Sequence, residues 1–318
     1  MIKYIREINR GYGECDFIMG NLSFGIWIPP VTLYPDMFER WELIENLGFD
    51  SIWNIDHFTN PIKMGETPWL ECWTSMAALA ARTRKIRIGT LVTNMIYRNP
   101  ATLAKQIVTV DHLSNGRLTF GIGAGASTDP SHPMTGVEPW GNKERVERFR
   151  EFVEIFNLMM TQEVSSYDGR YYKVKDAIMV PLPVQKPRPP LLIAAKGPKM
   201  LKLAANLADN WNFLPPFGLS AEEALEETKQ RNEMITHFAT EAGRDPDSID
   251  RSLCAGWTKE RPFDSKDNFI EFVNRYREIG INEFHLGFWT EKIPDNPLHA
   301  ITSIEMLETI AHEAIPEL

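Results

Sequence analysis

Short apolar runs alternate with longer amphipathic stretches along almost the whole chain, and this alternation limits the possible folds more than any other feature of the sequence. The short runs have the length and the β-branched or aromatic content of buried strands, and the longer stretches carry apolar residues at helical spacing. Glycine closes several of the helical stretches, for example at Gly48 and at Ser114-Asn115-Gly116. The pattern predicts repeated, parallel strand and helix units.

The sequence holds eight such pairs. We expect strands at 22–28, 51–55, 86–90, 118–122, 191–194, 210–213, 249–256 and 283–286. We expect helices at 36–47, 69–82, 101–113, 143–160, 198–207, 221–241, 264–280 and 297–311. Eight parallel strands close into a barrel without a free edge, whereas an open doubly wound sheet usually has about five or six strands. The count therefore predicts the α/β class and a (β/α)8 TIM barrel.

One segment breaks the alternation. Residues 168–190 hold a turn at Asp168-Gly169, alternating residues from Arg170 to Val180 and five prolines, a density that central strands do not tolerate. We predict an insertion after the fourth helix, built as a hairpin or an extended cover. We expect a single domain over 1–318 that includes this insertion and an N-terminal extension at 1–20.

Net charge and cysteine usage exclude several classes of function. The chain has 34 Lys and Arg against 43 Asp and Glu, a net charge of −9, and no basic block that would neutralise phosphates, so no nucleic-acid partner is predicted. The three cysteines are far apart and no histidine has metal-ligand spacing, so neither a disulfide framework nor a metal site is predicted. No apolar run reaches the roughly 20 residues that span a bilayer. We expect a cytoplasmic protein with no membrane partner.

Functional groups of a barrel of this kind follow the C-terminal ends of its strands. Asp56 and His57 follow the second predicted strand, where a histidine can exchange a proton near neutral pH, although a lone histidine is more often structural. The glycine-rich run 121–126 follows the fourth strand. It is a poor dinucleotide fingerprint, because its third glycine comes one position early and residues 127–130 do not open a helix. Its small residues either bring the backbone close to a ligand or only let the strand pack and turn.

A second glycine segment follows the fifth predicted strand and reads Ala195, Lys196, Gly197, Pro198, Lys199 and Met200. Gly197 permits close approach of a ligand, and Pro198 suits the first position of a helix whose free amides and dipole would face an anion. The segment predicts a site for a cofactor phosphate, with a plain, well-capped loop as the alternative.

Large apolar side chains follow many of the predicted strands. We expect the substrate to contact Trp27, Phe58, Phe213, Trp257 and Trp289, and Met95, Phe217 and Phe288 occupy similar positions. If the strand ends converge, these side chains line one cavity, which predicts an apolar or ring-containing substrate. The alternative is that several of them pack as core beneath the 168–190 insertion.

Four motifs resemble a known family in their order and spacing. They are Gly48 to Trp53 ahead of Asp56-His57, Ile88 to Thr90 followed by Arg98 to Ala101, Asp111 to Arg117, and Gly121 to Gly125. This set resembles the bacterial luciferase-like superfamily over almost the whole chain. Asp-His after the second strand and Ala-x-Gly-Pro after the fifth are most similar to the branch that uses the deazaflavin coenzyme F420.

The resemblance implies a role for each motif. Asp56 and His57 would lie beside the deazaflavin ring, with His57 moving a proton, and Thr90-Leu91 would form a bulge, often with a cis peptide bond, that backs the ring. Thr93 would contact the ring or the tail, and the segment Ala195 to Met200 would hold the phosphate. A TIM barrel, hydride transfer with a small-molecule substrate and a homodimer follow as family expectations. An FMN-dependent monooxygenase stays open, since FMN has nearly the same shape and phosphate, and so does a non-catalytic flavin-binding barrel.

The chain also departs from this branch. Ala126 stands where the alcohol- and sugar-oxidising members carry a glutamate, and Pro61 stands at a position that is often tryptophan. Residues 214–218 hold no cation that could grip a sugar phosphate. We therefore do not expect glucose 6-phosphate as the substrate.

Overall fold

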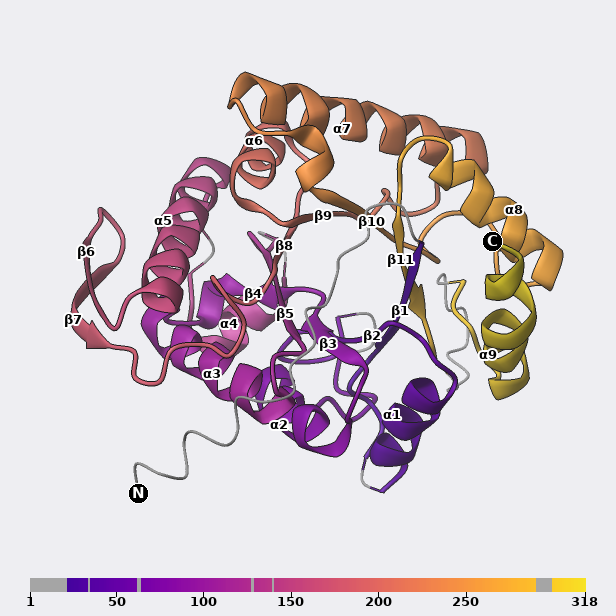
Figure 1. Ribbon diagram of the computed structural model, residues 1–318, viewed down its shortest axis with the longest axis horizontal. Helices are drawn as coiled ribbons and strands as arrows, with labels where there is room; N and C mark the ends of the chain where they lie inside the picture. Colours follow the sequence, from indigo (N-terminus) through magenta and orange to yellow (C-terminus); the bar gives the residue numbers. More distant parts are fainter. Residues whose placement is uncertain (1–21, 34, 62–63, 127–128, 139, 290–298) are drawn as a thin grey trace.

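The short apolar runs form eight parallel strands that close into a barrel (Figure 1). The computed structural model describes residues 22–33, 35–61, 64–126, 129–138, 140–289 and 299–318, so the predicted extension at 1–20 lies outside the described residues. The barrel strands are β1 (Ser23–Ile28), β2 (Ser51–Asn54), β3 (Arg87–Thr90), β5 (Leu118–Gly123), β8 (Leu191–Ala194), β9 (Asn210–Phe213), β10 (Asp250–Cys254) and β11 (Glu283–Gly287).

Strand pairing closes the ring. The order around the barrel is β3, β2, β1, β11, β10, β9, β8 and β5, and β3 pairs with β5 to complete the circle. A two-residue strand, β4 (Thr93–Asn94), follows β3 after a break of two residues and also pairs with β5. These pairings confirm the predicted (β/α)8 TIM barrel.

Helices surround the barrel on its outside (Figure 1). The longer ones are α1 (Asp36–Asn46), α2 (Cys72–Arg82), α3 (Pro100–Ser114), α5 (Asn142–Thr161), α6 (Pro198–Leu207), α7 (Ala221–Glu241) and α8 (Lys266–Arg277). Shorter ones are α4 (Ser131–Thr135), α9 (Ile304–Thr309), the 3-10 turns η1 (Met95–Tyr97), η2 (Pro246–Ser248) and η4 (Ile315–Glu317), and the π-helical turn η3 (Ile310–Ala314). None of the helices in the described ranges is long and apolar enough to cross a membrane.

Local sequence sets the helix ends, as α3 illustrates. The Asn99 side chain accepts hydrogen bonds from the backbone N–H groups of Ala101 and Thr102, each at 3.0 Å, and Pro100 occupies the first turn. Asn115 ends the helix in the left-handed region, with φ at 57°. The capped start of α3 therefore follows η1 almost directly. This fixes the position of Arg98, the residue just before Asn99.

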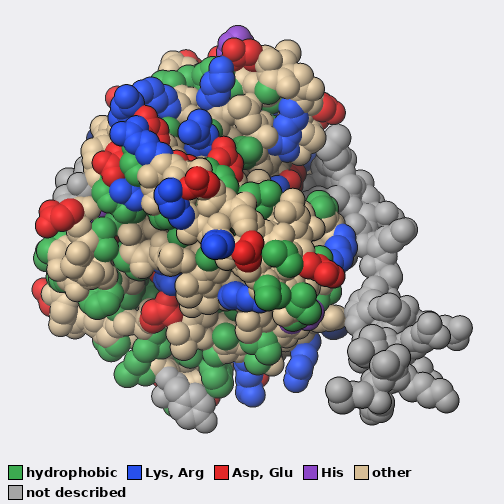
Figure 2. Space-filling model, turned by 90° about the vertical axis from the view of Figure 1, so that its left-hand side faces the viewer, with side chains coloured by type: hydrophobic (Ala, Val, Ile, Leu, Met, Phe, Trp, Pro, Cys, Tyr) green, Lys and Arg blue, Asp and Glu red, His purple; other side chains and the backbone are tan. Residues whose placement is uncertain are grey.

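The expected hairpin is present but begins earlier than predicted. It consists of β6 (Val164–Asp168) and β7 (Lys173–Ile178), which pair antiparallel, so the insertion starts soon after α5 and not at residue 168. Its outer side exposes Val164, Ile178 and Val180. Figure 2 shows the side of the molecule that carries α5 and the hairpin, where apolar side chains lie among charges of both signs.

Two helix predictions are wrong. The last helix begins at Ile304 and not near 297, because the Ser303 hydroxyl accepts the Met306 N–H at 3.1 Å as its cap, while Ile301 pairs with Phe288 as a β-bridge. Conversely, a short helix, α4, does follow the glycine-rich run, because the Asp129 carboxylate accepts the Ser131 N–H at 2.8 Å in its first turn.

Glycine makes room for two indole rings inside the barrel. A Cβ atom at Gly25 or at Gly89 would come within 2.4 Å of the Trp53 ring, and one at Gly287 would come within 2.4 Å of the Trp27 ring. Trp27 and Trp53 are each 2% exposed. Large aromatic side chains packed against glycine backbone thus fill the interior of the barrel. They form the bottom of its C-terminal mouth.

Candidate functional site

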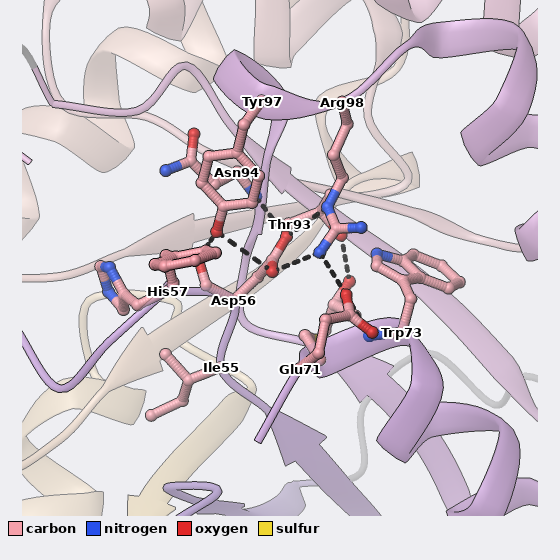
Figure 3. A network of polar contacts seen from close by, with 12 residues as sticks. Ile55, Asp56, His57, Glu71, Trp73, Thr93, Asn94, Tyr97 and Arg98 are labelled. Carbon is pink, nitrogen blue, oxygen red and sulfur yellow. Dashed lines mark hydrogen bonds and ion pairs between the residues drawn. The ribbon is translucent and has the colours of Figure 1, made fainter. Parts of the chain in front are cut away.

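Asp56 and His57 lie at the C-terminal mouth of the barrel, two and three residues after the end of β2. The side chains around them come from η1, from the loop before α2 and from the segment between β5 and α4, so several strand-to-helix connections build the site (Figure 3). The convergence of strand ends predicted from the barrel thus brings together residues more than 70 positions apart in sequence, such as His57 and Asp129.

The Asp56 carboxylate is buried and fully paired. Arg98 donates to both oxygens, from Nε at 2.7 Å and from a terminal guanidinium nitrogen at 2.5 Å. The Asn94 N–H donates to one oxygen at 3.0 Å and the Tyr97 hydroxyl to the other at 3.2 Å. The same terminal nitrogen of Arg98 also donates to the Glu71 carboxylate at 2.8 Å. A carboxylate with this many donors is held rigidly and positions its neighbours, and the catalytic role of Asp56 stays a prediction.

Neighbouring charges fix the protonation states in this network. Burial and the adjacent Asp56 charge raise the pKa of the Tyr97 phenol well above its usual range, so this hydroxyl stays a neutral donor. Burial opposes the charge on Arg98, but its hydrogen bonds to Asp56 and Glu71 raise the pKa of the guanidinium overall. The ion pair between Asp56 and Arg98 therefore anchors the backbone just before His57.

The His57 ring lies at the edge of the mouth, with 31% of its side chain exposed. Its Nδ1 atom is 3.3 Å from an oxygen of the Asp129 carboxylate, and the Trp69 ring meets the imidazole edge-on at 6.2 Å between centroids. The Trp69 indole N–H also donates to the His57 carbonyl at 2.8 Å. Both the ring and the backbone of His57 are held in place, and Nε2 is left for a ligand.

Asp129 is the acid of the site that sequence reasoning missed. Its side chain is only 5% exposed, and it accepts hydrogen bonds from the Asn94 side chain at 3.1 Å and from the Ser131 N–H at 2.8 Å. Burial alone would raise its pKa, but the hydrogen bonds from His57 and Ser131 hold the pKa of this carboxyl well below its usual range.

A backbone bulge follows β3, as expected from Thr90-Leu91, and its cis peptide bond joins Leu91 and Val92. The Thr90 hydroxyl donates to the Gly121 carbonyl at 2.7 Å and accepts the Gly121 N–H at 3.1 Å, and the Thr93 hydroxyl donates to Thr90 at 3.0 Å. Both threonines are 0% exposed and their hydroxyls tie the bulge to β5, and the ligand contact of Thr93 stays a prediction. The partly exposed side chains here are Leu91 and Val92.

The predicted phosphate segment forms the N-terminus of α6. The Ala195 N–H donates to the Asn212 carbonyl at 3.2 Å and its carbonyl accepts the Trp211 indole N–H at 3.0 Å, so Ala195 anchors the segment and is not available to a phosphate. Lys196, Gly197, Pro198 and Lys199 are exposed and Met200 is partly exposed.

This helix start has the features of an anion site. No side chain caps Gly197, no acid lies in the first turn, and the first hydrogen bond of the helix runs from the Leu201 N–H to the Gly197 carbonyl at 2.9 Å. The amides of Lys199 and Met200 therefore point out of the helix without an intrahelical partner. A Cβ atom added at Gly197 would meet nothing within 4 Å, so the space beside this residue at the helix start is open.

The aromatic side chains predicted for the substrate divide into two groups. Trp27, Trp289 and Trp257 lie in one cluster at the mouth, together with Leu91 and Val92 of the bulge, and the rings of Trp27 and Trp257 are 6.4 Å apart. Phe58 is 55% exposed beside His57.

Phe213 is a wrong prediction, because it is 0% exposed and packs with Trp211, at 5.7 Å, in the layer between the barrel and its helices. Met95 and Phe288 are also buried in that layer, and Phe217 is 58% exposed. Asn212, which lies between these two aromatics, points into the barrel instead. Its side-chain amide contacts Ser252 and His285.

Comparisons with known proteins agree with this geometry. The family model described as luciferase-like monooxygenase matches residues 24–256. An F420-dependent glucose-6-phosphate dehydrogenase of Amycolatopsis mediterranei is 35% identical over 179 residues, which are 55% of this chain and 52% of that protein. A 5,10-methylenetetrahydromethanopterin reductase of Archaeoglobus fulgidus is 30% identical over 252 residues, 79% of this chain and 69% of that protein. The chain thus spans about half the length of the first of these relatives.

The fold is shared with a solved structure. The coenzyme F420 dependent tetrahydromethanopterin reductase from Methanopyrus kandleri superposes with a TM-score of 0.75 at 19% identity, and the match covers 93% of this chain and 99% of that one. Because the family model spans well over half of the sequence, and because the barrel carries the expected bulge and strand-end residues, the chain belongs to the luciferase-like monooxygenase family.

Proposed function

We propose that this protein is a coenzyme F420-dependent oxidoreductase that transfers a hydride between the deazaflavin and an apolar or ring-containing substrate. The observation that carries the proposal is the partly exposed His57, which is paired with Asp129 and contacts Trp69, a member of the same cluster as Leu91 and Val92. The F420 dependence named for the Amycolatopsis and Methanopyrus proteins supports the choice of cofactor.

The residues present fit this cofactor at two places. The free amides of Lys199 and Met200 suit its phosphate, and the apolar Leu91 and Val92 side chains on the bulge suit one face of a flat ring. When bound, the deazaflavin accepts or gives a hydride at ring carbon five, which is chemistry that no side chain supplies. The chain contributes binding, orientation and the movement of one proton.

Nε2 of His57 is the group that moves the proton. In the oxidative direction a substrate alcohol carbon loses a hydride with both bonding electrons, and its hydroxyl proton passes to Nε2, so that a carbonyl compound is left. In the reductive direction the protonated imidazole returns this proton to the oxygen. A positioned histidine contributes about 10²–10⁴-fold to such a step.

The mouth also indicates how a substrate is recognised. The indole N–H groups of Trp27 and Trp289 are buried and have no hydrogen-bond partner among the described residues. Leaving a buried donor unpaired costs about 1–3 kcal/mol, so an oxygen acceptor on the substrate would be favoured there. We infer a ring-containing or apolar molecule with a carbonyl or hydroxyl oxygen. Residues 214–218, after β9, carry no cation, so glucose 6-phosphate is not proposed.

A binding titration tests the proposal. We expect F420 to bind the purified protein and to become reduced or oxidised when a suitable alcohol or carbonyl compound is added, with FMN binding more weakly. If FMN bound and F420 did not, and if reduced FMN with substrate consumed oxygen, the protein would be a monooxygenase. The homodimer, the single domain and the cytoplasmic location stay predictions from the sequence and the resemblance.

A further inference from the structure

We propose that Asp129 is the positioning residue that fixes the proton of His57 on Nδ1, so that Nε2 is the nitrogen that exchanges a proton with the substrate. This inference rests on the proposed function for its consequence in catalysis. The tautomer of His57 is a property of the cofactor-free protein, so the tautomer and the proposed function can be disproved separately.

The Asp129 carboxylate is oriented from three directions. One oxygen accepts the Ser131 N–H at 2.8 Å at the start of α4. The other oxygen lies 3.1 Å from the Asn94 amide nitrogen and 3.3 Å from Nδ1 of His57. Asn94 is itself fixed, because its carbonyl oxygen accepts the Ile96 N–H at 3.1 Å and its backbone N–H donates to Asp56. The oxygen that faces His57 therefore has little freedom to turn away.

An ionised carboxylate can only accept hydrogen bonds. Since hydrogen bonding holds Asp129 ionised, the nitrogen that faces it must carry a hydrogen. Neutral imidazole has one N–H, and here that is Nδ1–H, which leaves a lone pair on Nε2 to take a proton. Protonated imidazole places its second hydrogen on Nε2, ready to be donated. The same carboxylate thus serves both directions of the reaction.

Within the described ranges, the other charged and titratable groups around the imidazole do not compete for Nδ1. The Asp56 carboxylate, one residue earlier, is occupied by Arg98, and the Tyr97 hydroxyl on η1 donates to Asp56. His132 on α4 is buried and makes no hydrogen bond within the described part of the chain. Asp129 is therefore the group that selects the tautomer.

Replacing Asp129 by asparagine changes one atom in a way that tests this. The amide oxygen of Asp129→Asn would keep the Ser131 N–H, and the NH₂ group would then face both Nδ1 and the Asn94 amide nitrogen, so the variant also loses the hydrogen bond from Asn94. Because NH₂ is a donor, Nδ1 would become the acceptor and the proton would move to Nε2. The equivalent change in a Ser-His-Asp triad leaves the geometry intact and gives the wrong tautomer.

Nitrogen-15 NMR of the cofactor-free protein reads the tautomer directly. We expect Nδ1–H in the natural protein and a shift toward Nε2–H in Asp129→Asn, with kcat lowered by about 100-fold and the affinity for F420 changed by less than about threefold. Asp168→Asn, a matched change on the exposed hairpin, should alter neither. Nε2–H in the natural protein, which requires no variant, would overturn the proposal, as would an Asp129→Asn enzyme with the natural tautomer and rate. A protein that binds FMN alone would remove the proposed function and leave the tautomer measurement valid.

Discussion

The two sides of the barrel mouth differ in how their polar groups are satisfied. On the side formed by β2, η1 and the segment before α4, the carboxylates of Asp56 and Asp129 are each paired with a cation or an imidazole and with backbone donors. On the side formed by β1 and the chain after β11, the indole donors of Trp27 and Trp289 are buried without a partner in the described residues. Polar groups this deeply buried are nearly always hydrogen-bonded in native proteins.

The difference assigns separate tasks to the two sides. On the paired side the two carboxylates have their partners without a ligand, and His57 is held there at a fixed place as the proton-transfer group. The unpaired side becomes complete only when an acceptor arrives, which is the behaviour of a substrate surface. Changes on the paired side should therefore alter the rate or the stability, and changes on the indole side should alter substrate affinity.

The largest effect is expected from His57→Ala. Loss of the proton-transfer group should lower kcat by about 10²–10⁴-fold, while the affinity for the cofactor stays within about threefold. His237→Ala, an exposed histidine on α7, is the matched control and should leave both values unchanged. Steady-state kinetics with a fluorescence titration of F420 give both quantities. An equal loss of cofactor affinity would instead place His57 among the binding residues.

Removing Arg98 should destabilise the protein by leaving the Asp56 carboxylate on the paired side without its cation. In Arg98→Met the buried Asp56 carboxylate loses its charge partner, and the free energy of unfolding should fall by about 3–5 kcal/mol. Arg82→Met removes an exposed ion pair with Glu42, whose side chains are 48% and 41% exposed, and should cost at most about 1 kcal/mol. Urea denaturation of the two variants measures the contrast. Similar losses would mean that the Asp56 network is no more than a surface contact.

Gly197→Val tests the predicted phosphate segment 195–200, which belongs to neither the paired nor the unpaired side of the mouth. The added side chain extends into the open space beside the start of α6, where we propose that the phosphate binds, so cofactor affinity should fall about tenfold. Lys199→Ala removes one exposed, screened charge and should weaken binding by no more than about threefold. Fluorescence titration of F420 compares them, and equal affinities in the Gly197→Val and natural proteins would place the phosphate elsewhere.

The barrel could be predicted from sequence because its strands are short, apolar and separated by amphipathic helices. Strands β8 and β9 and helices α6 and α7 begin and end where the pattern places them. The last helix could not be located in this way, because residues before Ile304 also carry a proline and helix-compatible side chains, and the bridge between Phe288 and Ile301 keeps part of that segment extended.

The site was predicted only where neighbours in sequence are also neighbours in space. Asp56 and His57 are adjacent, whereas Asp129 reaches His57 from 72 positions away, a contact that no local spacing reveals. Phe213 was misplaced for a different reason. In Asn210-Trp211-Asn212-Phe213 the strand alternation puts both aromatics on one face, and this barrel directs the asparagines inward and the aromatics toward the helices.

Trp289→Phe tests the unpaired side with little change in shape. The phenyl ring keeps most of the apolar surface but lacks the N–H, so affinity for a substrate with an oxygen acceptor should fall by about fivefold, or about 1 kcal/mol, with the cofactor affinity unchanged. Trp41→Phe on α1 is the control, because its indole belongs to the core cluster and not to the mouth cluster of Trp27 and Trp289. Substrate titration against the F420-loaded enzyme measures the effect. Parallel loss of F420 in Trp289→Phe would assign this indole to the cofactor.

The smallest expected effect concerns acid stability and the pair formed by His57 and Asp129. The pKa of Asp129 in the folded protein lies below its ordinary value, so its ionised form stabilises the fold above that value, and this contribution declines as the pH falls toward the folded-state pKa. Asp129→Asn has no such contribution to lose. Between about pH 5 and pH 3 the free energy of unfolding should therefore fall by about 1 kcal/mol less in Asp129→Asn than in the natural protein.

Asp168→Asn serves again as the control in this measurement. Asp168 has 82% of its side chain exposed in an ion pair with Lys173, so its replacement should leave the acid-dependent loss of stability as it is in the natural protein. Urea denaturation at the two pH values gives the difference for all three proteins. If Asp129→Asn followed the natural protein, the hydrogen bonds to Asp129 would orient His57 without stabilising the fold. The contrast between the paired and the unpaired side would then lie in geometry alone.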